Sequence, residues 1–213
     1  MPDDAMPTDI LLFFGSFNPV HKGHIAIAQA AIAQHIAKEI WFVLSPQNPF
    51  KKADGLWPEA EREGRLQKAL DPYPQFHLCD AELQLPKPSY TIQTLDFLHQ
   101  AYPEKQFGIL MGQDNLSRLH LWKEYNRILA ECDIWVYPRA NQKSNEAFPG
   151  SNTETPSPAD TTQFRAPADW SCYPAVQQYP DKIHPLDCPL LDISSTQIRQ
   201  LISQGKDFSF LIP

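Results

Sequence analysis

The stretch ILLFFGSFNPVHKGH, residues 10–24, joins an apolar run to a loop rich in glycine and histidine. Continuous apolar residues, as in 10–14, are typical of a strand buried on both faces of a parallel sheet. After the loop, apolar side chains recur at helical spacing from Gly23 to Lys38. The sequence therefore predicts a strand, a loop and a helix in that order, with the loop at the carboxyl end of the strand.

The same alternation continues along the chain. A second apolar run, 40–44, closes a strand–helix–strand unit whose crossover should be right-handed. Further elements are predicted from apolar periodicity and from the residues that bound each segment. Strands are expected at 76–79, 107–111 and 134–137, and helices at 59–70, 91–101 and 122–130. The order predicts one α/β domain spanning 1–213, with a Rossmann-like, doubly wound parallel sheet.

One segment, from about 140 to 180, interrupts the alternation. Asn, Ser, Thr and Pro dominate there, and such a composition does not supply enough apolar surface for a packed core. We expect a flexible surface insert. The regular pattern returns at 189–193 and continues into a helix that ends near Gly205.

The bulk composition restricts the classes of function. The chain has 213 residues, of which 42% are apolar and 20% charged, as in an ordinary globular protein. A net charge of -7 argues against nucleic-acid binding, which needs a basic face to displace counterions. The apolar run 10–14 is too short to cross a membrane, and Asp3 and Asp4 stand where a signal peptide would be basic. We therefore expect a cytoplasmic protein with neither nucleic-acid nor membrane partners.

The loop after the first strand has the features of a phosphate site. Ligands of open α/β sheets bind at the carboxyl ends of the strands, and a helix that begins there directs unpaired N–H groups at an anion. Gly15 and Gly23 allow backbone to approach a ligand closely. His21 and His24 lie three positions apart, so both imidazoles can face one phosphate group, whose charge favours their cationic forms. A metal site is a weaker interpretation, because no third ligand follows at a suitable spacing, and four widely separated cysteines predict neither a zinc cage nor disulfides.

A second motif, SSTQIR at 194–199, places hydroxyl groups at a helix start and an arginine one turn inside it. Alone, the pattern favours a helix cap and a solvated arginine. Beside a phosphate loop, Arg199 instead offers a planar fork that can bind two phosphate oxygens. Together with the first motif, the pattern favours a binding role for these residues over a simple helix cap.

These two motifs resemble those of the bacterial nicotinate-mononucleotide adenylyltransferases, within the nucleotidyltransferase superfamily marked by His-x-Gly-His, and the resemblance runs almost end to end. It implies catalytic contacts with ATP phosphates from His21, His24 and Arg199. The remaining ATP-binding residues implied by the resemblance are Gly15, Ser16, Phe17, Ser194, Ser195 and Thr196.

Three further segments resemble the acceptor side of that family: PSYT at 88–91, GQDNL at 112–116, and Trp122. Taken alone, each has a simpler interpretation as a half-buried tyrosine, a helix cap or a core tryptophan. The resemblance implies that Trp122 stacks on the pyridine ring and that Thr91 and Asp114 form hydrogen bonds. The implied substrate contacts also include Tyr90 and Lys51, although Lys51 could equally be a solvated charge in its loop.

The reaction that the resemblance implies is condensation of ATP with nicotinate mononucleotide to give nicotinate adenine dinucleotide and pyrophosphate, in NAD biosynthesis. Such a transfer needs positioning and charge stabilisation rather than a nucleophilic side chain. Mg²⁺ is expected to arrive on the ATP phosphates, without dedicated protein ligands. The alternatives are nicotinamide mononucleotide or phosphopantetheine as the acceptor, and a noncatalytic nucleotide-binding regulator or an RNA-binding relative.

Overall fold

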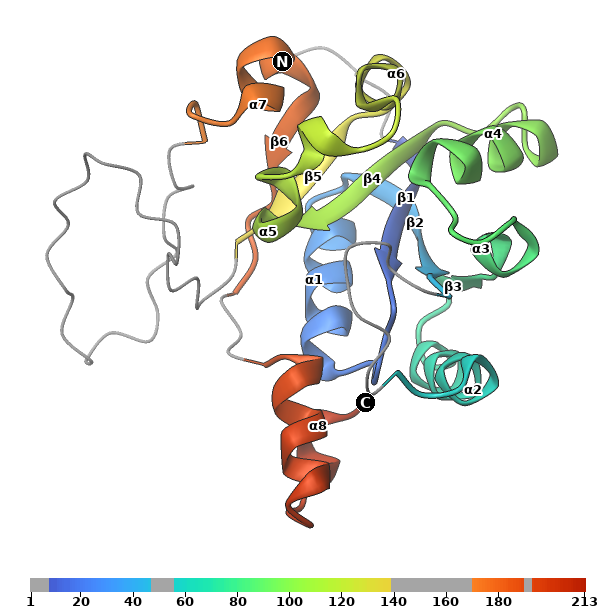
Figure 1. Ribbon diagram of the computed structural model, residues 1–213, viewed down its shortest axis with the longest axis vertical. Helices are drawn as coiled ribbons and strands as arrows, with labels where there is room; N and C mark the ends of the chain where they lie inside the picture. Colours follow the sequence, from blue (N-terminus) through green and yellow to red (C-terminus); the bar gives the residue numbers. More distant parts are fainter. Residues whose placement is uncertain (1–7, 47–55, 139–169, 190–192) are drawn as a thin grey trace, which may run out of the picture.

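The computed structural model describes residues 8–46, 56–138, 170–189 and 193–213, and within these ranges six strands form one sheet (Figure 1). The strands are β1 Thr8–Gly15, β2 Ala37–Leu44, β3 Phe76–Cys79, β4 Phe107–Gly112, β5 Ile134–Tyr137 and β6 Ile183–Pro185. Their order is β3-β2-β1-β4-β5-β6, and every neighbouring pair is parallel. The chain thus winds outward in one direction from β1 and in the other from β4, which confirms the doubly wound α/β fold.

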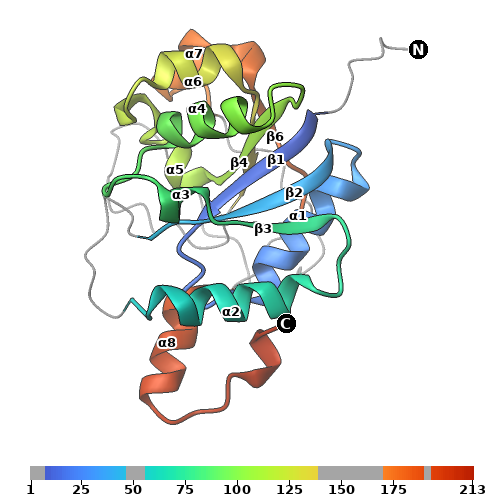
Figure 2. The ribbon, with the colours of Figure 1, turned by 90° about the vertical axis from the view of Figure 1, so that its right-hand side faces the viewer.

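Helices cover both faces of this sheet, as Figure 2 shows for α4, α6 and α7 on one side and α1 and α2 on the other. The helices are α1 Lys22–Ala33, α2 Glu59–Leu70, α3 Ala81–Gln84, α4 Thr91–Ala101, α5 Gln113–Leu116, α6 Tyr125–Glu131, α7 Pro174–Gln178 and α8 Ser195–Ser203. Successive side chains of a strand point to opposite faces. Ile10 and Leu12 accordingly pack on the α4 and α6 side, whereas Leu11 and Phe13 pack on the α1 and α2 side.

Two of the expected helix boundaries are wrong. Helix α1 ends at Ala33 rather than Lys38, because His35 adopts a left-handed backbone (φ 55°) and β2 has already begun at Ala37. Helix α6 begins at Tyr125 rather than Trp122, because Glu124 is also left-handed (φ 54°) and redirects the chain. Periodicity does not reveal such single-residue turns at positions without glycine.

The C-terminal part of the expected flexible insert is ordered, contrary to the prediction. Trp170 is only 8% exposed, and Ala175 in α7 is buried in the same core as α4 and α6. The hydroxyl of Tyr125 donates to Gln178 Oε1 at 2.7 Å, which ties α7 to α6. The following strand β6 was not predicted, since three residues ending in proline show no alternation. Residues 139–169 lie outside the described ranges, and flexibility there stays a prediction.

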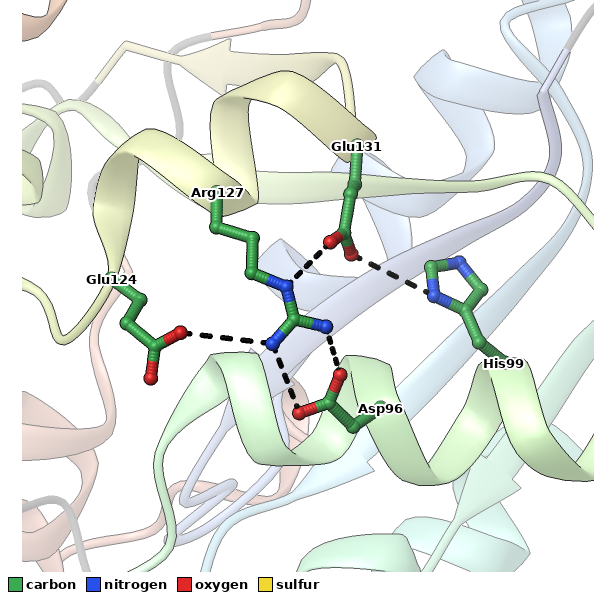
Figure 3. A network of polar contacts seen from close by, with 5 residues as sticks. All are labelled: Asp96, His99, Glu124, Arg127 and Glu131. Carbon is green, nitrogen blue, oxygen red and sulfur yellow. Dashed lines mark hydrogen bonds and ion pairs between the residues drawn. The ribbon is translucent and has the colours of Figure 1, made fainter.

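A network of exposed charges joins α4 to α6 (Figure 3). The Arg127 guanidinium donates to Asp96 across the helix pair and to Glu131 one turn along α6, while His99 Nδ1 lies 3.7 Å from Glu131 Oε2. These carboxylates, Asp96 first, raise the pKa of Arg127. Because solvent screens exposed ion pairs, the network orients the two helices more than it stabilises the fold.

Candidate active site at the carboxyl edge of the sheet

The segments singled out from the sequence meet at one edge of the sheet. Strands β1 and β4 are neighbours, and they end at Gly15 and Gly112 respectively. The N–H of Ser45, which follows β2, donates to the carbonyl of Gly15 at 2.9 Å. The chain order reverses between β1 and β4, and in open α/β sheets this reversal is where ligands bind.

The loop after β1 holds a strained backbone at Phe17. Its φ of 41° lies in the left-handed region, which bulky side chains rarely adopt. The ring is 2% exposed and packs on Phe13 and His24, with ring centroids 5.8 and 5.1 Å away. A Cβ on Gly15 would lie 2.9 Å from this ring, so glycine is required there. Strain that packing holds in place is a feature of functional sites, which supports the assignment of this loop.

His21 and His24 form a stacked pair at the start of α1. Their ring centroids lie 3.7 Å apart with an interplanar angle of 27°. Gly23 makes this arrangement possible, because a Cβ at that position would come within 2.9 Å of His21 Nδ1. The spacing His-x-Gly-His therefore has a steric reason in addition to a chemical one.

His24 accepts a hydrogen bond from the backbone through its ring. The backbone N–H of His21 donates to His24 Nδ1 at 3.2 Å. An Nδ1 atom that accepts carries no proton, so in this arrangement the proton of the ring is on Nε2; the cationic form expected beside a bound triphosphate stays a prediction. His24 still offers Nε2–H as a donor for a phosphate oxygen.

The second motif is attached directly to the first. Ser195 Oγ donates to the carbonyl of Pro19 at 2.9 Å, and Arg199 Nη1 donates to the carbonyl of Asn18 at 2.6 Å. The other arm of the guanidinium donates to Thr196 Oγ1 at 3.2 Å. Ser194 caps the helix by accepting from the N–H of Gln197 at 3.2 Å, as its simpler interpretation predicted. The start of α8 is thereby fixed against the loop that precedes the histidine pair.

The acceptor-side residues lie on neighbouring elements. Tyr90 precedes α4 and Thr91 is its first residue, while Asp114 lies in the first turn of α5, directly after β4. Tyr90 and Trp122 pack against the same hydrophobic core. The ammonium group of Lys123 lies 5.0 Å from the centroid of the Tyr90 ring, which brings the two segments together. Lys51 lies outside the described residues.

Arg62 is a buried cation that the sequence reasoning missed. It lies in α2 and is 0% exposed. Its guanidinium donates to the carbonyls of Ser16 (2.8 Å), Ser45 (2.8 Å), Pro46 (3.1 Å) and Trp57 (3.1 Å). Burial lowers its pKa. Its burial could have been predicted from its position four residues before Leu66, on the apolar face of an amphipathic helix.

Glu82 is a buried anion that was also missed. It lies in α3, is 4% exposed, and accepts a hydrogen bond from the hydroxyl of Thr94 at 3.3 Å, while the hydroxyls of Ser45 and Ser89 lie near enough to lower its pKa. Burial raises the pKa of its carboxyl group, against the opposing effect of these hydroxyl donors. Its sequence surroundings carry no periodicity that would single it out.

Comparison with known proteins agrees with this geometry. The family model of the cytidylyltransferase-like proteins matches residues 12–201, and the chain belongs to that family. A curated relative from Bacteroides fragilis, named "Probable nicotinate-nucleotide adenylyltransferase", is 37% identical over 94% of this chain and 85% of its own length. A relative of the same name from Flavobacterium johnsoniae is 36% identical over 95% of this chain and 90% of its own length. The resemblance predicted from the motifs is confirmed.

A solved structure shows the same fold. The Plasmodium falciparum nicotinic acid mononucleotide adenylyltransferase, complexed with NaAD, aligns with a TM-score of 0.67 at 17% identity, covering 94% of this chain and 86% of that one. Within the described ranges no helix is long and apolar enough to cross a bilayer, and no three His, Cys, Asp or Glu side chains gather as metal ligands.

Proposed function

We propose that this chain is a nicotinate-nucleotide adenylyltransferase, which transfers the adenylyl group of ATP to nicotinate mononucleotide and releases pyrophosphate. The observation that carries the proposal is the attachment of Ser195 and Arg199 to the Asn18–Pro19 backbone, beside the stacked histidines. This attachment gathers donors from two distant motifs around one loop. The names of the curated relatives support the same activity.

The phosphates of ATP would be bound mainly by donors. His24 Nε2–H, the first N–H groups of α1 and the Arg199 guanidinium can each bind a phosphate oxygen, and these groups favour the charge that develops on the departing pyrophosphate. His21 completes the histidine pair. Gly15, Ser16 and Phe17 would line the nucleotide, and Ser194, Ser195 and Thr196 would complete the phosphate side from α8.

Mg²⁺ would enter with ATP. The groups around the Asn18–Pro19 loop are imidazole, guanidinium and backbone donors, which suit phosphate oxygens rather than a cation. The ion would therefore be held chiefly by the phosphates themselves, and it would supply charge neutralisation for the leaving pyrophosphate.

The acceptor would lie on the side of Tyr90, Thr91, Asp114 and Trp122, with Lys51 as a candidate phosphate contact. Its own phosphate, ionised at neutral pH, can attack the α-phosphate in line once both substrates are aligned. Lys123 lies over the Tyr90 ring and adds a positive charge beside this aromatic surface. A cation there favours a ring that carries a carboxylate, which supports nicotinate over nicotinamide.

We also propose a cytoplasmic location without nucleic-acid or membrane partners, supported by the net charge of -7. The activity is tested by incubating the purified chain with ATP and Mg²⁺ and either nicotinate or nicotinamide mononucleotide, with pyrophosphate release as the readout. We expect strong release with nicotinate mononucleotide. Preference for nicotinamide mononucleotide would overturn the choice of substrate. If neither acceptor reacts while ATP still binds, the chain is a noncatalytic nucleotide binder.

A further inference from the structure

The buried charges Arg62 and Glu82 share one partner, Ser45. The Ser45 carbonyl accepts from Arg62 Nη1 at 2.8 Å, and the Ser45 hydroxyl lies near enough to the Glu82 carboxyl group to lower its pKa. Its N–H donates to the carbonyl of Gly15 at 2.9 Å. A single residue at the end of β2 thus connects the buried cation, the buried anion and the end of β1.

Arg62 holds the phosphate side of this arrangement. All four of its hydrogen bonds go to main-chain carbonyls, one of them at Ser16 in the loop that precedes the histidine pair. Burying a cation costs free energy, and methionine could fill such a space without that cost. A planar fork that joins three separate chain segments is something only arginine provides.

Glu82 holds the acceptor side. Ser89 directly precedes Tyr90 and Thr91, and Thr94 lies one turn inside α4. Both residues are buried; the Thr94 hydroxyl donates to the Glu82 carboxylate at 3.3 Å, and the Ser89 hydroxyl lies near enough to lower the pKa of that group. The carboxylate therefore fixes the start of the helix that presents the proposed substrate residues.

We propose that Arg62, Ser45 and Glu82 form a buried polar relay. The relay fixes the position of the loop that leads to the histidine pair, residues 15–24, relative to the segment that presents the acceptor residues, 89–94. None of the three needs to touch a substrate, so they are positioning residues. In-line attack depends on the relative placement of two bound substrates, and an error of about 1 Å can cost on the order of 100-fold in rate. The inference rests on the proposed function, because it supposes that both loops serve one reaction.

The test compares Arg62→Lys, Ser45→Ala and Glu82→Gln with the parent chain. Single-turnover formation of the dinucleotide at saturating ATP and nicotinate mononucleotide should fall roughly 10- to 100-fold in each variant, while the affinity for each substrate alone changes only a few-fold. Arg62→Lys combined with Glu82→Gln should be little slower than the worse single variant, because both act through Ser45. Arg65→Lys, an exposed arginine of the same helix paired with Glu61, is the matched control and should behave as the parent chain.

Hydrogen–deuterium exchange provides a readout that does not depend on activity. Glu82→Gln should speed exchange at residues 15–18 as well as at 89–94, and Arg62→Lys should speed it at 89–94 as well as at 15–18. The relay would be overturned if Arg62→Lys changed exchange only at 15–18 and Glu82→Gln only at 89–94. A single-turnover rate within twofold of the parent chain in folded variants would also overturn it. If Arg62→Lys does not fold, Ser45→Ala and Glu82→Gln decide the matter. A parent chain that makes no dinucleotide would refute the proposed function, and the exchange pattern would still decide whether the two loops are coupled.

Discussion

Replacing Gly23 with alanine should separate catalysis from stability. Gly23 is the second residue of α1, and a Cβ there would lie 2.9 Å from Nδ1 and 3.0 Å from Cε1 of His21. His21 is buried, so its ring cannot move away without breaking the stack on His24. Losing one transition-state donor costs on the order of 100-fold or more. A displaced rather than deleted histidine should lower kcat by roughly 10- to 100-fold.

The free energy of unfolding should fall only slightly or stay unchanged. Alanine is favoured over glycine in a helix interior by up to about 1 kcal/mol, which offsets part of the cost of the contact with His21. Gly64 provides the matched control, because it lies in α2 with no atom within 4 Å of its would-be Cβ. Gly64→Ala should raise the Tm by roughly 1–4 °C and leave kcat unchanged.

The assay for both variants is pyrophosphate release at saturating ATP, with unfolding followed by circular dichroism. Gly23→Ala with kcat within threefold of the parent chain would refute the steric argument for the His-x-Gly-His spacing. A lower kcat accompanied by an equal loss of kcat in Gly64→Ala would show that helix propensity, rather than the histidine contact, is responsible.

Three further outcomes are expected. His24→Ala should lower kcat by on the order of 100-fold or more while the chain stays folded, since it removes the Nε2–H donor, and near-normal turnover at saturating ATP would reject that role. Arg199→Lys should reduce kcat/KM for ATP by roughly 10-fold, because lysine cannot bond Asn18 and Thr196 as a planar fork. An equal reduction in Arg65→Lys would show that the loss is not specific to Arg199. A thiol reagent at pH 8 should label Cys172 alone in the folded chain, because burial raises the pKa of Cys79 and Cys188 to about 11 and that of Cys132 to about 12; labelling of a second thiol before unfolding would contradict this.

The sequence was sufficient for the fold because its strands are buried on both faces. Apolar runs such as 10–14 and 107–111 are unfavourable at a surface exposed to water, so their place inside the sheet was predictable. A glycine follows each run, which marked the edge of the sheet where the loops lie. Helix ends were less predictable. They depend on His35 and Glu124, which adopt left-handed backbones without the glycine that usually signals such a turn.

The candidate site was only partly predictable, because some of its features are properties of pairs of segments. The contact between Arg199 and Asn18 joins residues far apart in sequence, and no local pattern specifies it. The hydrogen bond from the backbone N–H of His21 to His24 Nδ1 likewise depends on how the loop meets the start of α1, which residue type alone does not show.

Arg62 occupies a buried position that the periodicity of α2 marks in the sequence. A helix whose buried positions are Arg62, Leu66, Ala69 and Leu70 has one charge on its apolar face, and a buried cation must find acceptors. Helix α2 is the first helix after β2 in the chain, and the carbonyls at the carboxyl end of a strand are acceptors that the sheet leaves without partners. The charge therefore pointed to a bond between α2 and the strand-end loops, and hence to the very edge of the sheet where the two substrates would meet.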